Sequence, residues 1–325
     1  MDLVTKKHLQ LYAGRSHPEL AQEVADSLGV TLGDAALVDF PNTELRATFG
    51  ESIRGADVFI LQSHAAPVNE ALMEQAIMLD AAKRASAKRI TAVCPYYGYG
   101  RQDRKGKGRE PITAKLVADI LSAAGADRIV SVDLHSGQIQ GFFDGPFDHL
   151  TAAPQLEEYI RAEMAGDDDF VVVAPDQGRT KVADRYAQHL GCDMASVFKR
   201  RAKDKIATVE AVGVMGDVAG RRCVLIDDMI DTAGTICAAA EILMTNGASD
   251  VWCIATHGVL SGPAVDRLKN SKLSKVVVTN TLPTGPDKQF DKLEVLSVAP
   301  LIADAIRAVF EDASVSELFG GENQF

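Results

Sequence analysis

Two adjacent carboxylates and a loop of small residues separate an apolar run from a helical pattern near residue 230. Val224–Ile226 predicts a buried strand, Asp227 and Asp228 follow it, and Ala238–Met244 predicts a helix. Such a unit directs backbone N–H groups at one point, where the helix dipole favours an anion. The carboxylates would repel a phosphate there, so the pattern indicates a sugar phosphate whose hydroxyls, or bound Mg²⁺, meet them. Small residues that admit a phosphate to this loop are Thr232, Gly234 and Thr235.

Two other interpretations of this segment compete with a sugar-phosphate site. An ordinary strand–turn–helix would use Asp231 or Thr232 as the helix N-cap. That interpretation explains one acidic residue well, but this short run contains three, Asp227, Asp228 and Asp231. The acidic strand of a P-loop ATPase would need a Gly-x-x-x-x-Gly-Lys-Ser/Thr motif upstream, and the chain has none.

Composition describes a cytosolic globular protein. The 325 residues are 46% hydrophobic and 24% charged, a length that favours two domains. The net charge of −11 argues against nucleic acid as a partner. Five scattered cysteines, an odd number, indicate reduced thiols, which predicts a cytoplasmic location. No apolar stretch approaches membrane-spanning length, so no membrane partner is expected.

Short apolar strands alternate with helical patterns along most of the chain, which predicts an α/β fold with mainly parallel sheets flanked by helices. Helices are expected at Leu72–Ala85 and Thr113–Ala124, the latter ended by Gly125. A weak sequence similarity between residues 53–62 and 218–227 indicates two similar domains. The strands expected besides Val224–Ile226 are Val58–Leu61, Ile90–Val93, Ile129–Val132, Val171–Ala174, Val251–Ala255 and Val276–Val278.

Two clusters of basic residues interrupt this acidic chain. Arg101–Ile112 is polar and contains glycines, which predicts an exposed loop. Phe198–Lys205 carries five cations and is expected to form a mobile loop rather than a core strand. Each cluster suits either a solvated surface or a pocket for a small polyanion.

The run from Val224 to Thr235 resembles the phosphoribosyl-diphosphate motif shared by type I phosphoribosyltransferases and ribose-phosphate pyrophosphokinases. The segment from Arg101 to Ile112 resembles the ATP-binding loop found only in the pyrophosphokinases. The resemblance extends from Gly14 to Phe319 and implies transfer of the diphosphoryl group of ATP to the 1-hydroxyl of ribose 5-phosphate. Its product, 5-phosphoribosyl 1-diphosphate, supplies nucleotide, histidine and tryptophan synthesis.

The resemblance assigns substrates to particular residues. For ribose 5-phosphate they are Arg201, Asp227, Asp228, Asp231, Thr232, Ala233, Gly234 and Thr235, and for ATP they are Phe40, Asn42, Thr43, Glu44, Arg101 and Gln102. The family's aromatic residue at Phe40 stacks on adenine. Two alternatives remain open, a plain phosphoribosyltransferase and a non-catalytic regulatory relative of the enzyme.

The resemblance also implies a Mg²⁺ cofactor and a cationic lid. His135 matches the family's metal-binding histidine, and Asp176 matches the neighbouring metal contact. Arg179 stands where the family more often has a second glycine. Lys199 and Arg201 match the catalytic residues that close over the reacting phosphates.

Regulation and assembly are further implications of the resemblance. The family binds activating phosphate or inhibitory ADP between subunits and forms hexamers. The matching residues are Ser52, Arg54, Ser314, Ser316 and Phe319. A helix cap and a C-terminal anchor explain these residues about equally well.

The expected domains are 1–150, an N-terminal phosphoribosyltransferase-like domain with the ATP-binding loop, and 151–305, a C-terminal domain of the same kind with the ribose 5-phosphate site. Residues 306–325 are expected to pack back on the first domain.

Overall fold

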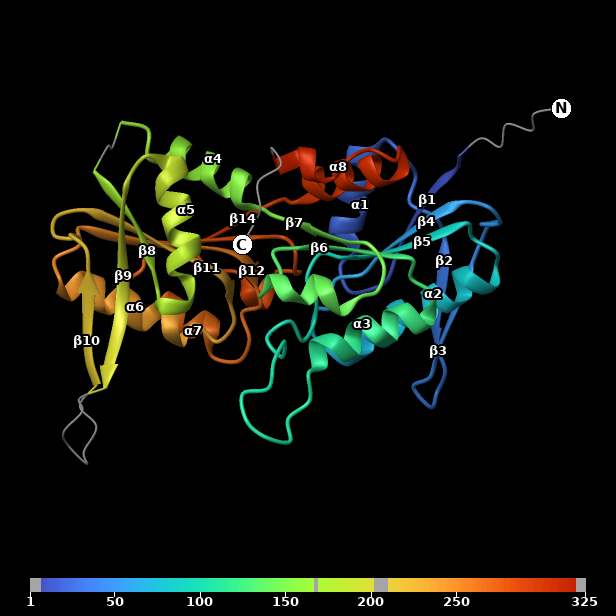
Figure 1. The fold of residues 1–325 in the computed structure, drawn as a ribbon, viewed down its shortest axis with the longest axis horizontal. Helices are drawn as coiled ribbons and strands as arrows, with labels where there is room; N and C mark the ends of the chain where they lie inside the picture. The colour runs from blue at the N-terminus through green and yellow to red at the C-terminus, as the bar shows by residue number, and fades with distance from the viewer. Residues whose placement is uncertain (1–6, 167–168, 202–209, 320–325) are drawn as a thin grey trace. The chain divides into compact units, whose positions relative to one another are not determined.

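The computed structural model describes residues 7–166, 169–201 and 210–319, with only the backbone of 199–201 and 210–212. Contacts divide the chain into two compact units (Figure 1). Of the described residues, unit 1 contains residues 7–151, Thr281–Pro283 and residues 297–319. Unit 2 contains Ala152–Asn280 and Thr284–Leu296. No helix in the described part of the chain is both long and apolar enough to cross a bilayer.

Unit 1 is built on a five-stranded parallel sheet in the order β1-β4-β5-β6-β7. All five residues of β4 are buried, as a strand covered on both faces requires. Its strands are β1 (Leu9–Ala13), β4 (Asp57–Leu61), β5 (Arg89–Cys94), β6 (Arg128–Val132) and β7 (Phe147–Leu150). The three strands expected in this half are therefore confirmed.

Helices cover both faces of this sheet. Helix α1 (Pro18–Leu28) packs against α8 (Ala299–Phe310), and α2 (Val68–Arg84) packs against α3 (Thr113–Ala124) (Figure 1). Helix α3 has the expected bounds and ends at Gly125, whose φ of 119° is left-handed. Helix α8 belongs to unit 1, whereas the sequence-based division assigned residues up to 305 to the second domain.

An antiparallel hairpin stands apart from the sheet of unit 1. Strands β2 (Ala35–Asp39) and β3 (Leu45–Phe49) pair from Ala35 opposite Phe49 to Asp39 opposite Leu45. The hairpin packs on α2 through β3. Residues Phe40–Glu44 form its turn, with Thr43 at a φ of 71°.

Unit 2 is built on a seven-stranded sheet in the order β10-β9-β8-β11-β12-β13-β14. Every pairing is parallel except that of β10 with β9. Its strands are β8 (Phe170–Ala174), β9 (Asp193–Arg201), β10 (Glu210–Met215), β11 (Arg222–Ile230), β12 (Asp250–Gly258), β13 (Lys275–Thr279) and β14 (Leu293–Leu296). Its helices are α4 (Ala153–Glu163), α5 (Thr180–Leu190), α6 (Gly234–Thr245) and α7 (Ala264–Lys269).

The two units follow one plan, which confirms the duplication that the sequence indicated. In each, one strand is followed by a helix, an antiparallel hairpin and four further parallel strands. The order β1-β4-β5-β6-β7 thus corresponds to β8-β11-β12-β13-β14. Strands β4 and β11, which lie in the two similar sequence segments, occupy equivalent positions in their sheets. The units differ at the hairpin, because β9 joins the sheet of unit 2 and β2 does not join that of unit 1.

Candidate active site

Strand β11 continues beyond the residues expected to end it. The sequence placed Asp227 and Asp228 after the strand, but β11 runs to Ile230 and includes both. Its pairing with β12 extends to Asp227 opposite Ala255 and resumes at Met229 opposite His257. The reason is that β12 is itself nine residues long and supplies a partner for the extra length. The carboxylates therefore project from a paired strand rather than from a free loop.

The loop after β11 forms the start of α6 without a side-chain cap. Ala233 is the N-cap, with φ 59° and ψ 8° in the left-handed region, and no side chain caps the helix. The interpretation of Asp231 or Thr232 as N-cap is therefore wrong. A helix leaves its first N–H groups without intrahelical partners. The N–H groups of Gly234 and Thr235, at the start of α6, are thus suited to an anion.

Two residues from the following segment support this loop. The Ser261 hydroxyl donates a hydrogen bond to the Asp231 carboxylate, and the Ser261 N–H donates to the Asp231 carbonyl at 3.0 Å. Arg267 Nη1 donates to the Thr232 carbonyl at 2.9 Å. A methyl group at Gly234 would lie 3.5 Å from the same guanidinium. Arg267 thus brings a cation to the loop, and it was missed because it lies 35 residues from Thr232 without a local motif.

Asp227 and Asp228 share one cation, Arg179. Arg179 Nε lies 2.9 Å from Asp227 Oδ1, and Arg179 Nη2 lies 2.5 Å from Asp228 Oδ1. All three side chains are at most 16% exposed. Burial, followed by repulsion from Asp228, raises the pKa of Asp227 well above its ordinary value, and Arg179 opposes that rise.

Asp176 lies at the turn that follows β8 in unit 2. Its Oδ1 accepts a hydrogen bond from the Gly178 N–H at 2.8 Å and caps the short 3₁₀ helix η2 (Gln177–Arg179). Among the described residues, no three His, Cys, Asp or Glu side chains are grouped to hold a metal. His135 belongs to unit 1 and Asp176 to unit 2.

The Arg101 loop and the His135 segment lie side by side in unit 1. Gln138 Nε2 donates to Asp103 Oδ2 at 2.6 Å, and a methyl group at Gly100 would lie 3.7 Å from His135 Cβ. Arg101 and Gln102 are exposed, as expected for this loop, whereas Asp103 is buried. Gln102 Oε1 accepts a hydrogen bond from Thr113 Oγ1 at 2.5 Å, which ties the loop to the start of α3.

The β2–β3 turn borders a cavity of about 1100 Å³ in unit 1. Phe40, Thr43 and Glu44 line it, and Phe40 is 42% exposed. Asn42 Oδ1 accepts a hydrogen bond from the Glu44 N–H at 3.2 Å and shapes the turn. Neither Arg101 nor Gln102 lines this cavity, so the two predicted ATP segments do not share it.

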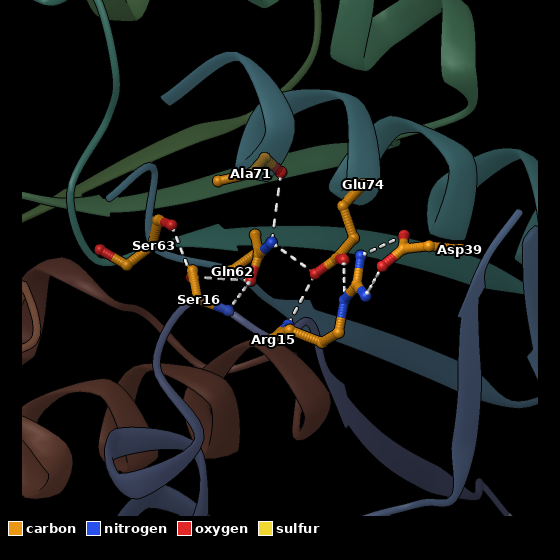
Figure 2. A network of polar contacts seen from close by, with 7 residues as sticks. All are labelled: Arg15, Ser16, Asp39, Gln62, Ser63, Ala71 and Glu74. Atoms are coloured by element: carbon orange, nitrogen blue, oxygen red, sulfur yellow. Dashed lines mark hydrogen bonds and ion pairs between the residues drawn. The ribbon is translucent and has the colours of Figure 1, made fainter. Parts of the chain in front are cut away.

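A polar network forms one wall of this cavity (Figure 2). Glu74 Oε1 accepts from the Arg15 N–H at 2.6 Å and from Gln62 Nε2 at 2.9 Å. Glu74 Oε2 pairs with Arg15 Nε, and Arg15 Nη1 pairs with Asp39, both at 2.6 Å. The Ser16 hydroxyl donates to Gln62 Oε1 at 2.8 Å. No local sequence motif predicts this network, because its members come from separate elements.

The predicted cationic lid is not a loop where the structure describes it. Lys199 and Arg201 lie in β9, paired with Val212 and Glu210 of β10. The expectation of a loop at these two positions is wrong, because the antiparallel partner β10 supplies backbone hydrogen bonds that a local pattern does not reveal. The following residues 202–205 lie outside the described part of the chain.

The five predicted regulatory residues all belong to unit 1. The Ser314 and Ser316 hydroxyls are 2.8 Å apart, and Ser316–Phe319 form the short helix η4. The Ser52 carbonyl accepts from Gln10 Nε2 at 3.4 Å. Arg54 is exposed in the turn before β4.

Two α/β units of one plan, with polar residues at the carboxyl ends of parallel strands, define a class of protein that binds its ligands at those ends. The comparison with known proteins narrows this class. The model of the N-terminal domain of ribose phosphate pyrophosphokinase matches residues 9–125. The phosphoribosyl synthetase-associated domain matches residues 202–320.

Relatives and a solved structure agree with these two matches. A ribose-phosphate pyrophosphokinase of Streptomyces coelicolor is 57% identical over 314 residues, 97% of each chain. One of Mycobacterium tuberculosis strain H37Rv is 55% identical over 318 residues, 98% of this chain and 97% of the relative. The crystal structure of phosphoribosylpyrophosphate synthetase from Mycobacterium smegmatis matches with a TM-score of 0.90 and 55% identity, covering 94% of this chain and 100% of that one. The chain belongs to the ribose-phosphate pyrophosphokinase family, a family of enzymes.

Proposed function

We propose that this protein transfers the β,γ-diphosphoryl group of ATP to the 1-hydroxyl of ribose 5-phosphate. The hydroxyl oxygen forms a bond to the β-phosphorus, the bond from that phosphorus to the α,β-bridging oxygen breaks, and the hydroxyl proton is lost. The products are 5-phosphoribosyl 1-diphosphate and AMP. The observation that carries the proposal is identity of 55–57% to ribose-phosphate pyrophosphokinases along nearly the whole chain.

The acceptor sugar is assigned to unit 2. Its 5-phosphate would lie at the start of α6, where Ala233, Gly234 and Thr235 present backbone N–H groups. Asp227 and Asp228 would accept hydrogen bonds from the ribose hydroxyls. Asp231 would act by holding the loop, because its carboxylate already accepts from Ser261. Arg267 would add positive charge beside the phosphate.

The nucleotide is assigned to unit 1, where two segments suit different parts of ATP. The cavity beside Phe40 is lined by four carboxylates and one guanidinium, so it suits the uncharged adenine rather than the triphosphate. The exposed loop at Arg101 carries the cations that phosphates need. The carboxylates of the cavity are Asp39, Glu44, Glu70 and Glu74, and its guanidinium is that of Arg15.

Mg²⁺ is the cofactor that fits these residues, and it would neutralise the phosphates of ATP. Asp176 offers a hard carboxylate oxygen and His135 an imidazole. Mg²⁺ is usually held by one or two protein ligands, with water and substrate phosphates completing its shell. The side chains of Lys199 and Arg201 would stabilise the transferring group.

The resemblance to this family also supports proposals about assembly, regulation and location. We propose a cytoplasmic homo-oligomer, a hexamer, that is activated by phosphate and inhibited by ADP. Ser52, Arg54, Ser314, Ser316 and Phe319 are the residues proposed to bind these effectors. Size-exclusion chromatography with light scattering tests the assembly, and activity measured against added phosphate or ADP tests the regulation.

The reaction is tested by incubating purified protein with Mg²⁺, ATP and ribose 5-phosphate and separating nucleotides by ion-exchange chromatography. AMP should appear in step with 5-phosphoribosyl 1-diphosphate, and none should appear when the sugar is omitted. Removal of Mg²⁺ with a chelator should abolish AMP release, and excess Mg²⁺ should restore it. A plain phosphoribosyltransferase would instead consume 5-phosphoribosyl 1-diphosphate with a nucleobase. A regulatory relative would do neither.

A further inference from the structure

One guanidinium holds the carboxylates of two consecutive residues in unit 2. The two nitrogens on one edge of Arg179, Nε and Nη2, reach Asp227 and Asp228 respectively, at 2.9 and 2.5 Å. Consecutive residues of a strand normally point to opposite faces of the sheet. Asp227 Oδ1 also accepts from the Asp228 N–H at 2.9 Å, which turns this carboxylate back toward its neighbour. The pair is therefore held in a defined arrangement rather than projecting independently.

Burial and mutual repulsion both favour protonation of this carboxyl pair. Both side chains are largely buried, with 15% and 9% exposed, and neighbouring negative charges repel. A carboxyl that takes up a proton loses an acceptor and presents an O–H donor instead. The guanidinium opposes this change, and it has no acceptor of its own, so it acts on the pair only as a donor.

The backbone around Arg179 places this guanidinium. Asp176 caps η2, and the Arg179 N–H donates to the Asp176 carbonyl at 3.3 Å. Arg179 is also the N-cap residue of α5, so it lies between two helical segments. Strand β8 ends at Ala174 while its neighbour β11 continues to Ile230. The turn after β8 therefore lies beside the part of β11 that β8 does not pair with, which carries the two carboxylates.

We propose that Arg179 is a positioning residue of the acceptor site, which orients the carboxyl groups of Asp227 and Asp228 for hydrogen bonds with two neighbouring hydroxyls of the sugar. This proposal rests on the proposed assignment of these carboxylates to ribose 5-phosphate. Arg179 acts through the carboxylates and does not contact the reacting phosphates. It thereby contributes to the preference for a sugar that carries both hydroxyls over one that lacks the 2-hydroxyl.

The test compares Arg179→Gln with the unaltered enzyme in steady-state kinetics, with ribose 5-phosphate and 2-deoxyribose 5-phosphate as acceptors. We expect KM for ribose 5-phosphate to rise about ten- to hundredfold, the range for loss of a charged hydrogen-bond partner. KM for ATP should change less than twofold. The ratio of kcat/KM for the two sugars should fall several-fold, because the deoxy sugar uses one acceptor fewer.

Two further variants keep the result interpretable. Arg179→Lys keeps the positive charge but cannot donate two parallel hydrogen bonds. It should therefore raise KM for ribose 5-phosphate less than Arg179→Gln does. It should still lower the ratio of kcat/KM for the two sugars. Arg161→Gln is the matched control, because Arg161 is exposed on α4 and donates to the His189 carbonyl. Arg161→Gln should change neither KM for ribose 5-phosphate nor the ratio of kcat/KM for the two sugars. Circular dichroism and thermal unfolding establish that each variant is folded.

The proposal is overturned if KM for ribose 5-phosphate stays within twofold in both Arg179 variants, or if both Michaelis constants rise equally while the sugar ratio is unchanged. Asp228→Asn separates this failure from failure of the site assignment. If Asp228→Asn leaves sugar binding unchanged, the carboxylates do not bind the sugar, and both ideas fail. If it weakens sugar binding and the Arg179 variants do not, only the role of Arg179 fails.

Discussion

The imidazole of His64 is buried in unit 1, and both of its ring nitrogens have partners. Nδ1 accepts from the Gly98 N–H at 2.9 Å, and Nε2 lies 2.9 Å from Gln75 Oε1. Gln75 Nε2 donates to the Ile60 carbonyl at 3.1 Å, which orients its amide oxygen toward the histidine. Burial lowers the pKa of His64 to about 4. This histidine is therefore neutral in the folded protein at neutral pH.

We predict that His64 makes the folded state less stable in mild acid. Its pKa is lower in the folded state than the ordinary 6.5, so between pH 6.5 and about 4 the unfolded chain binds the proton first. The contribution of the neutral imidazole to the free energy of unfolding is fully present above pH 6.5. It is lost as the pH falls through this window, by up to about 3 kcal/mol. Chemical denaturation should show that the stability difference between the unaltered protein and His64→Gln narrows by this amount. A constant difference, or an imidazole that titrates near 6.5 by NMR, would contradict the prediction.

We predict that Lys199→Ala and Arg201→Ala lower turnover far more than they weaken ATP binding. Charge on the transferring diphosphoryl group is stabilised most in the transition state, so kcat should fall about 100-fold or more. KM for ATP should change only a few-fold. Lys269→Ala is a control, since that residue lies in the last turn of α7. Unchanged turnover in both variants would remove these two residues from the mechanism.

At the scale of elements, the C-terminal end of helix α3 requires a residue in the left-handed region. Gly125 closes α3 at a φ of 119°, and its N–H donates to the Leu121 and Ser122 carbonyls. A methyl group there would lie 2.8 Å from the Lys83 side chain. The close of α3 therefore depends on a residue without a Cβ.

We predict that Gly125→Ala lowers the free energy of unfolding by about 1–2 kcal/mol, because it forces an L-residue into the left-handed region. Gly141→Ala is the matched control in the same unit, where a methyl group meets nothing within 4 Å and φ is not left-handed. It should change stability by less than about 0.5 kcal/mol. Equal effects of the two substitutions would show that backbone conformation is not the cause.

At the scale of the whole molecule, the end of the chain completes the first unit. Helix α8 buries seven residues and packs on α1, although some 270 residues separate them. Asp312 pairs with Lys7 and Arg89, and these cations hold its pKa at about 2. Arg89 also pairs with Asp57 at the start of β4. Helix α8 and the residues just after it are therefore part of the packed structure of unit 1.

We predict that Ile306→Ala destabilises unit 1 selectively. Ile306 is fully buried, so the substitution should cost about 2–5 kcal/mol. Hydrogen exchange followed by mass spectrometry should show faster exchange in β1 and β4, with β8 and β11 little changed. Leu243→Ala, at a fully buried position of α6 in unit 2, should give the reverse pattern. Uniform acceleration in both variants would mean that the units unfold together.

The sequence predicted the elements well wherever periodicity alone forms them. Helix α3 has its predicted bounds, and the apolar runs at β4, β5, β6, β8, β12 and β13 are strands. Prediction from the sequence failed at Asp227–Ile230 and at Lys199–Arg201. Both segments are strands because a neighbouring strand pairs with them. Pairing of this kind depends on residues far away along the chain, so a local pattern cannot reveal it.

The sequence by itself determined the fold class, the duplication and the family, because these depend on periodicity and on motifs of adjacent residues. Only the tertiary structure decided which charges meet. Arg179 reaches Asp227 and Asp228 across 48 and 49 positions of the chain, and Arg267 reaches the Thr232 carbonyl. The physical reason is that parallel strands bring the residues at their carboxyl ends together, whatever their separation in the sequence. The sequence thus specified a pair of carboxylates, and the fold supplied the cation between them.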